Sequence, residues 1–240
     1  MKSDIIKLAR YDNGKGMTPH GAQAEAVLRK VRIASNLEID LRLQGEEWKT
    51  EKEMYPCWTG TLIVYEAPGE VFGKTIQFDS LTFNVPKKFQ GLRDRAIVMN
   101  HPDFLLSGNI LTPGKSAVDI PFPGEDGWYL PEPQFGIPSP LGGKTSDDGN
   151  SRHLWRRDEQ YVGLVSRWYF RWDGWDRRGV DCYCRPGGRL GVFGTTSGNV
   201  KLPRTCSANR TGRTLAEPRS PHKHEWTCRT CGAELGGKKK

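Results

Sequence analysis

The sequence predicts an α+β protein, in which an N-terminal helix and a small antiparallel sheet precede an irregular half made of short strands and loops. Three observations lead to this fold class. A helix-start signal stands at Thr18-Pro19, segments with the two-residue period of a strand follow it, and the chain becomes rich in Pro and Gly from residue 118 onward.

The segment 18–36 predicts the one long helix of the N-terminal half. Thr18 is a favourable N-cap, and Pro19 suits the first helical position because no backbone donor is needed there. Asn36 marks the expected end of the helix. The positions that share one helix face are Ala22, Ala26, Arg29 and Ile33.

Alternating patterns predict strands in the rest of the N-terminal half. Residues 37–44 (LEIDLRLQ) alternate apolar and polar side chains, as a half-buried strand does. Residues 57–70, 74–87 and 94–104 are further expected strands, separated by Pro and Gly turns. The first domain is therefore expected over 1–115.

The composition changes after this point. Residues 119–150 carry six Pro and six Gly, which prevents long regular elements, yet their spaced aromatic residues predict folding onto a core. Short strands are expected at the segments 153–157, 161–170, 179–184 and 189–194. This predicts a second domain over 116–200 and a polar tail over 201–240.

The overall charge allows an anionic partner without requiring one. The 240 residues carry a net charge of +8, and the mean hydropathy is −0.64. No apolar run resembles a secretion signal or a membrane span, so we expect a cytoplasmic protein with no membrane partner. In that compartment the six Cys residues do not imply disulfides.

A compact cluster near the C-terminus predicts a structural Zn²⁺ site. Its four candidate ligands are His222, His224, Cys228 and Cys231. The C-x-x-C-G turn presents two thiolates as zinc knuckles do. The alternative is a redox-active or incidental Cys pair.

Sequence motifs for catalysis are missing. The chain contains no G-x-S-x-G, no H-E-x-x-H and no phosphate-binding loop of the G-x-x-x-x-G-K type. The interpretation is that the protein is not an enzyme.

The segment 167–194 (RWYFRWDGWDRRGVDCYCRPGGRLGVFG) has an unusual residue choice. It holds seven aromatic residues, six Arg and three Asp, and no Lys, Glu, Gln or Met. Arg interleaved with aromatic residues is typical of single-stranded nucleic-acid binding. Aromatic residues, Arg, Asp and Gly together are equally typical of protein recognition surfaces.

Three motifs stand out in the second half of the chain: residues 127–138 (GWYLPEPQFGIP), 153–167 (HLWRRDEQYVGLVSR) and the patchwork that ends at 185–194 (RPGGRLGVFG). Together they resemble a known family, the variable proteins of diversity-generating retroelements. The resemblance covers roughly 118–195. It implies a C-type-lectin-like fold, related to that of formylglycine-generating enzymes, which displays diversified residues on one face.

The genetic code offers a separate test of this resemblance. If both adenines of template AAC codons are randomised, the resulting codons never encode Lys, Glu, Gln, Met or Trp. The first four are absent from 167–194, and the three tryptophans Trp168, Trp172 and Trp175 are then fixed framework. Cys182 and Cys184 become variable positions. The residues expected to contact a ligand are Tyr169, Phe170, Arg171, Asp173, Asp176, Asp181, Tyr183 and Arg185.

The expected function is therefore non-enzymatic binding of a macromolecular ligand, foremost a protein, through a diversified aromatic, Arg and Asp surface. The alternative is a nucleic-acid-binding protein that uses the basic aromatic segment and the zinc tail. A third hypothesis is an enzyme of the formylglycine-generating type with copper on Cys182 and Cys184.

Overall fold

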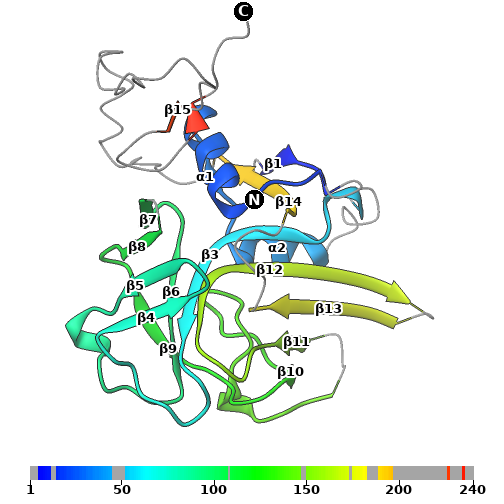
Figure 1. Ribbon diagram of the computed structural model, residues 1–240. Helices are drawn as coiled ribbons and strands as arrows, with labels where there is room; N and C mark the ends of the chain where they lie inside the picture. Colours follow the sequence, from blue (N-terminus) through cyan, green and yellow to red (C-terminus); the bar gives the residue numbers. More distant parts are fainter. Residues whose placement is uncertain are drawn as a thin grey trace, which may run out of the picture.

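The computed structural model describes most of the chain (Figure 1). The described residues are 5–11, 15–44, 52–107, 109–146, 150–172, 175–182, 189–196, 226–227 and 234–235. For 44, 52, 105–107, 168–172, 175–178, 181, 226–227 and 234–235 the description covers the backbone alone.

Strands outnumber helices throughout the described chain. The helical elements are α1 (Pro19–Leu28), α2 (Asn36–Gln44) and the short 3₁₀ turns η3 (Lys52–Met54), η4 (Lys87–Phe89) and η5 (Pro140–Gly142). The strands are β1 (Ile5–Ala9), β2 (Arg32–Ile33), β3 (Cys57–Tyr65), β4 (Thr75–Phe78), β5 (Leu81–Asn84), β6 (Arg95–Asn100), β7 (Phe104–Ser107), β8 (Ile110–Pro113), β9 (Val118–Pro121), β10 (Gly127–Tyr129), β11 (Arg152–Trp155), β12 (Tyr161–Trp172), β13 (Trp175–Asp181), β14 (Gly191–Thr195), β15 (Trp226–Thr227) and β16 (Glu234–Leu235).

The expected α+β class, with its C-type-lectin-like second half, is wrong. The described residues form a mostly β structure with a large sheet and two short α-helices. Strands from both halves of the sequence pair directly in that sheet, since β3 hydrogen bonds with β12 and β6 with β9. The expected boundary near residue 115 thus falls between strands of one sheet.

The large sheet is organised around β3, whose nine residues are all buried. Its strand order is β1-β14-β3-β12-β13-β11-β10, and β2, β6 and β9 pair off this path. Along one edge β3 pairs with β12; along the other it pairs first with β14 and then with β6. The continuous apolar pattern of β3 is what a central strand covered on both faces requires.

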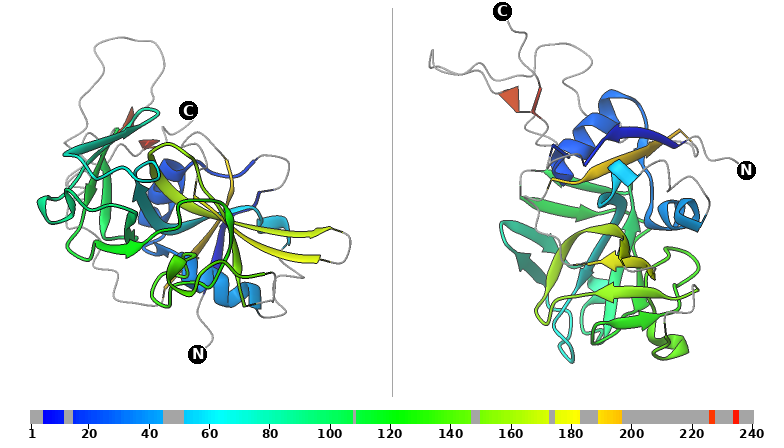
Figure 2. Two further views of the ribbon diagram at one scale, coloured as in Figure 1. Left: turned by 90° about the horizontal axis from the view of Figure 1, so that it is seen from below. Right: turned by 90° about the vertical axis from the view of Figure 1, so that its right-hand side faces the viewer.

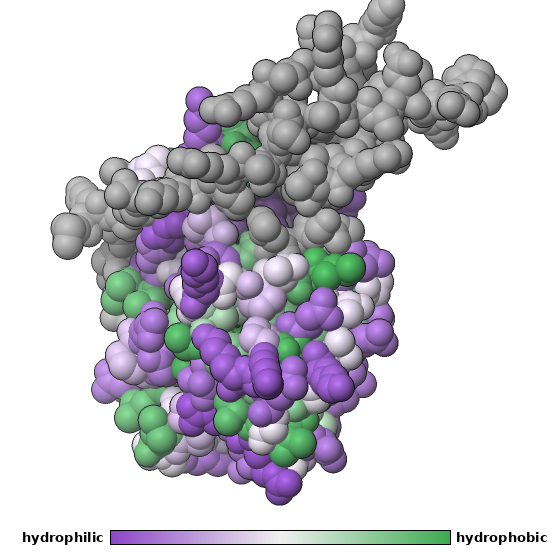
Figure 3. Space-filling model, turned by 90° about the vertical axis from the view of Figure 1, so that its left-hand side faces the viewer, coloured by the Kyte–Doolittle hydropathy of each residue, from purple (hydrophilic) through white to green (hydrophobic). Residues whose placement is uncertain are grey.

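A second, four-stranded sheet has the order β4-β5-β8-β7 and packs beside the large one (Figures 1 and 2). Its inward residues Ile76, Phe83 and Leu111 belong to the same apolar core as Trp58 and Leu164 of the large sheet. Seen from the side of this small sheet, the surface scatters apolar residues among polar ones (Figure 3). Single exposed apolar residues of this kind are ordinary.

Helix α1 begins as expected and ends earlier. The Thr18 hydroxyl accepts a hydrogen bond from Gly21 N at 3.2 Å, as an N-cap does. Lys30 adopts a φ of 57°, and Val31 N donates to Ala26 O at 2.9 Å. A left-handed residue followed by this bond ends a helix. Ile33 therefore lies in β2, outside the helix.

The expected strand at 37–44 is wrong, because these residues form α2. Ser35 N and its hydroxyl both donate to the Glu38 carboxylate, and Glu38 N donates back to the Ser35 hydroxyl. This reciprocal capping fixes a helix start. The helix buries Ile39 and Leu43, four residues apart, and leaves Leu41 58% exposed. The two-residue alternation was therefore misleading.

A close crossing at Gly60 joins the helical region to the sheet. Gly60 N donates to Ala34 O, and His101 N donates to Gly60 O, both at 2.6 Å. A Cβ atom at Gly60 would lie 2.4 Å from Ile33 O, so only glycine fits there. The His101 imidazole completes the crossing, because its Nδ1 accepts from Ile33 N at 3.1 Å.

We predict that His101 makes the protein sensitive to mild acid. Burial lowers the pKa of His101 from 6.5 to about 4, and the Arg32 charge acts in the same direction. The unfolded chain thus binds more protons between pH 6.5 and 4, so the free energy of unfolding falls as the pH decreases through this window, by roughly 3 kcal/mol. Urea unfolding at a series of pH values measures this dependence.

The variant His101→Gln keeps a side-chain acceptor and removes the titration, so its stability should change less with pH in this window. His20→Gln, on α1, is the control and should keep the wild-type dependence. Equal pH dependence in His101→Gln and the wild type would contradict the prediction.

Candidate functional site

The expected ligand-binding segment forms a two-stranded arm. In β12, residues 161–167 pair with β3, and the last of these pairs is Arg167 with Cys57. Residues 168–172 continue and pair with 175–179 of β13. Strand β13 in turn pairs with β11 from Gly179 onward. The arm, residues 168–178, therefore extends beyond its neighbouring strands, and Figure 2 (left) shows it projecting from the sheet.

The backbone register places five of the eight expected ligand-binding residues on the arm or at its base. Tyr169 pairs with Arg178, Phe170 with Arg177 and Arg171 with Asp176, and Asp181 pairs with Ser166 at the base. Asp173, Tyr183 and Arg185 lie outside the described residues, as does Cys184.

Cys182 does not fit its expected role as a variable surface position. Its side chain is fully buried in the core, and its carbonyl accepts a hydrogen bond from the Tyr65 hydroxyl at 2.9 Å. A changeable contact residue has to be accessible, so this expectation is wrong for Cys182. The same burial gives no support to a copper site on this residue.

A buried cluster of three charged residues lies at the base of the arm. Asp40 of α2 binds Arg152 of β11 through two hydrogen bonds, Nε to Oδ1 at 2.6 Å and Nη2 to Oδ2 at 2.9 Å. Arg167 of β12, the residue before the arm begins, also donates through Nη2 to Asp40 Oδ1. Because β11 and β12 flank β13, a single carboxylate connects α2 to both neighbours of that strand.

All three charged residues are removed from water, with exposures of 2% for Asp40, 2% for Arg152 and 0% for Arg167. Burial lowers the pKa of the Arg167 guanidinium, while the Asp40 charge opposes this and Arg152 adds to it. Two guanidinium groups that share one carboxylate make the cluster unusual, since buried charges are costly unless they are paired.

A row of three rings lies beside the base of the arm. The ring centroids of Trp128 and His153 are 5.2 Å apart, and those of His153 and Trp155 are 4.6 Å apart. The Trp155 ring covers Gly179 of β13 so closely that a Cβ there would lie 1.7 Å from it. Glycine at 179 thus lets the ring pack against the arm's base.

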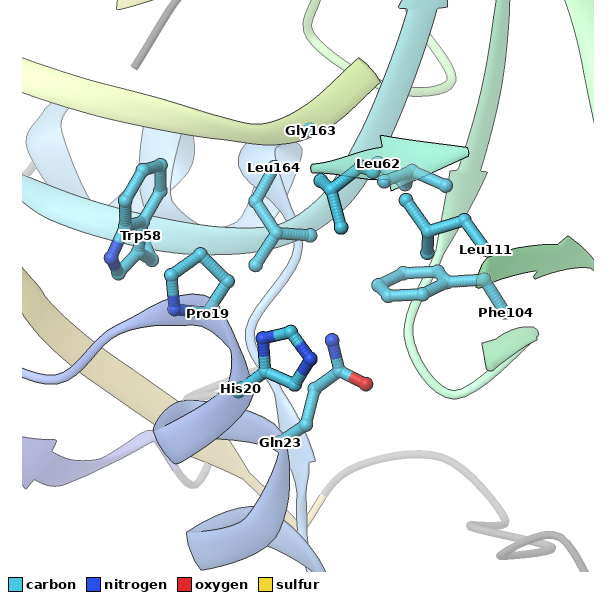
Figure 4. A pocket seen from close by; sticks show the side chains of 10 residues that line it. Pro19, His20, Gln23, Trp58, Leu62, Phe104, Leu111, Gly163 and Leu164 are labelled. Atoms are coloured by element: carbon cyan, nitrogen blue, oxygen red, sulfur yellow. The ribbon is translucent and has the colours of Figure 1, made fainter. Parts of the chain in front are cut away.

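A small concavity lies between α1 and the two sheets (Figure 4). His20 and Gln23 of α1 project toward an apolar wall that includes Trp58, Leu164 and Phe104. The free space is about 20 Å³, room for about one water molecule. None of the sequence-predicted site residues lines it, and its size suits no larger ligand.

The expected zinc ligands His222, His224, Cys228 and Cys231 lie outside the described residues. Within the described part of the chain, no three His, Cys, Asp or Glu side chains gather as a metal site would need. Neither α1, with ten residues, nor any other described helix has the length and apolar composition to cross a bilayer.

Sequence reasoning missed the charge cluster. Arg152 lies 112 residues from Asp40 in the chain, and Arg167 lies 127 residues from it, so no local pattern joins them. The only sequence signal for the cluster was that Asp40, Arg152 and Arg167 each lie in a segment that contains apolar residues.

We predict that Asp40→Asn destabilises the protein by about 3–5 kcal/mol, because two buried guanidinium groups lose their carboxylate. Urea unfolding measures the change. The control is Glu53→Gln, which removes the pair with Lys7, whose side chains are 37% (Lys7) and 30% (Glu53) exposed, and should cost less than about 1 kcal/mol. A similar loss in the two variants would show that the cluster contributes no more than a surface pair.

Comparison of the chain with protein-family models, with curated proteins and with solved structures finds no match.

Proposed function

We propose that this chain is a binding protein whose β12–β13 arm contacts a macromolecular ligand, foremost a protein, through residues that differ between copies of the gene. The residues proposed to contact it are Tyr169, Phe170, Arg171, Asp173, Asp176, Asp181, Tyr183 and Arg185.

One observation carries the proposal: the arm extends beyond the sheet while its base is fixed. Residues 168–172 and 175–178 pair with each other past the ends of β3 and β11. At the base, Arg167 is fully buried against Asp40. A firm base with a projecting end allows residues on the arm to change without disturbing the core.

The residue choice of the arm supports the same proposal. It combines Asp with aromatic residues and Arg, and Trp, Tyr and Arg are the residue types that contribute most at protein interfaces. The two Asp residues within the arm, Asp173 and Asp176, disfavour a purely phosphate-directed surface. Single-stranded nucleic acid is therefore the second candidate ligand, and salt separates it from protein recognition.

We predict that Tyr169→Ala and Arg171→Ala weaken ligand binding at least tenfold and change the melting temperature by less than about 2 °C. The probe is a synthetic peptide selected against the full chain from a display library of random dodecamers, and calorimetry measures its affinity. Arg167→Ala, at the buried base, should instead lower the melting temperature strongly.

Two outcomes would contradict the proposal. The first is that Tyr169→Ala and Arg171→Ala unfold the chain. The second is that an oligothymidine strand binds the arm more tightly than any selected peptide, with an affinity that falls steeply as salt increases.

We also predict a specific arrangement of the gene, as the resemblance to retroelement variable proteins implies. A near-repeat of the segment that encodes 161–194 should lie beside a reverse-transcriptase gene. The two copies should differ only where the template copy has adenine. Sequencing the gene's neighbourhood tests this, and an isolated gene with no near-repeat would remove the diversification part of the proposal.

A further inference from the structure

Among the described residues, one backbone edge of the arm has no strand partner. Strand β12 loses its partner β3 after Arg167, because β3 begins at Cys57. From 168 to 172 its one hydrogen-bonded neighbour among the described residues is β13. Along a β-strand the backbone N–H and C=O groups point to alternate sides, so about half of those in 168–172 are directed away from β13.

We propose that this outer edge of β12, residues 168–172, binds an extended polypeptide segment of the ligand as an added β-strand. The inference rests on the proposed function and names how the arm makes contact. Main-chain hydrogen bonds would supply the affinity, and side chains at alternate positions the specificity. Five residues of strand span about 16 Å, which suits a partner segment of about five residues.

The residues of this edge favour strand addition. Three of its five positions are Trp or Phe and one is Tyr, and such residues have high β-propensity. The edge has neither Pro nor Lys, which are common means of preventing unwanted strand pairing. The opposite edge of the arm is formed by residues 175–178 of β13, which read WDRR. The charged residues of that edge disfavour the addition of a strand there.

The charges of the arm define the partner's chemistry. Within 168–178 there are three Arg and two Asp residues, and Arg171 is the one charged residue of the β12 edge. Opposite charges on directly paired strand positions are stabilising. The partner segment is therefore an extended, mainly apolar or aromatic stretch with an acidic residue opposite Arg171.

The first test needs no ligand. Amide hydrogen exchange, measured residue by residue by NMR on the full chain, should alternate along 168–172, with every second amide exchanging at least tenfold faster than its neighbours. If all of these amides are protected in the monomeric chain, the edge is already covered and the proposal is overturned. Protection that appears only as the chain dimerises would assign the edge to a second copy and overturn it too.

The second test uses the selected dodecamer peptide and a set of its N-methylated versions. N-methylation removes one backbone donor, so it should weaken binding by about five- to tenfold at every second position and leave the positions between unchanged. The fast amides of 168–172 should become protected when the peptide binds. A loss without this period would overturn strand addition.

A matched pair of variants locates the edge on the protein. Of Tyr169→Pro and Phe170→Pro, the one that replaces a fast-exchanging amide should abolish peptide binding with the amide protection of β13 unchanged. The other should disrupt β13. A different outcome is that Arg171→Ala weakens binding while neither the N-methyl series nor this pair has the expected effect. That outcome would support ligand binding by the arm and overturn strand addition. Peptides whose affinity is unchanged in every arm variant would contradict the proposed function itself.

Discussion

The position of the arm depends on one carboxylate. Asp40 is buried on α2 and binds Arg152 and Arg167, one buried arginine from each of the two strands that flank β13. In the interior these charges have no access to water, so each requires its partner. Helix α2 is thus held against the sheet, and the arm leaves the sheet at the residue that follows Arg167.

A polar network around β3 holds the N-terminal end of α2. Asn36 N donates to the Thr61 hydroxyl at 2.9 Å, and that hydroxyl lies 2.6 Å from Asn100 Oδ1. The Asn36 side chain also donates to Phe135 O at 2.8 Å. These bonds join α2, β3, β6 and the segment before η5. Together with the shared apolar core, they connect the base of the arm to the rest of the described fold.

The sequence predicted several strands of the large sheet, including β3, β6, β12 and β14, since alternation and long apolar runs report burial directly. The apolar run in 57–65 corresponds to β3, and the segment 74–87, expected as one strand, forms the two strands of the β4–β5 hairpin. The predicted element type was wrong at 37–44, where local alternation competed with the capping pair Ser35 and Glu38. That pair was the better signal, because capping acts through specific hydrogen bonds.

The candidate site was predictable only in part. Residue choice marked the arm, because composition is a local property. The cluster at its base was not marked, since it joins residues more than a hundred positions apart. How far a strand projects past its neighbours is set by register, and register depends on which strands pair. No single segment contains that information.

Backbone pairing explains how changeable side chains and a defined binding mode can share one arm. A β-ribbon is held by hydrogen bonds between main-chain groups, which every residue except Pro supplies. Randomised AAC codons encode Pro among other residues, so diversification at Tyr169, Phe170 or Arg171 would occasionally produce a chain that cannot pair at that position. A ligand that adds a strand to the edge would meet the same backbone in all remaining copies, while the changed side chains would select among ligands. Diversification would then alter specificity and preserve the mode of contact.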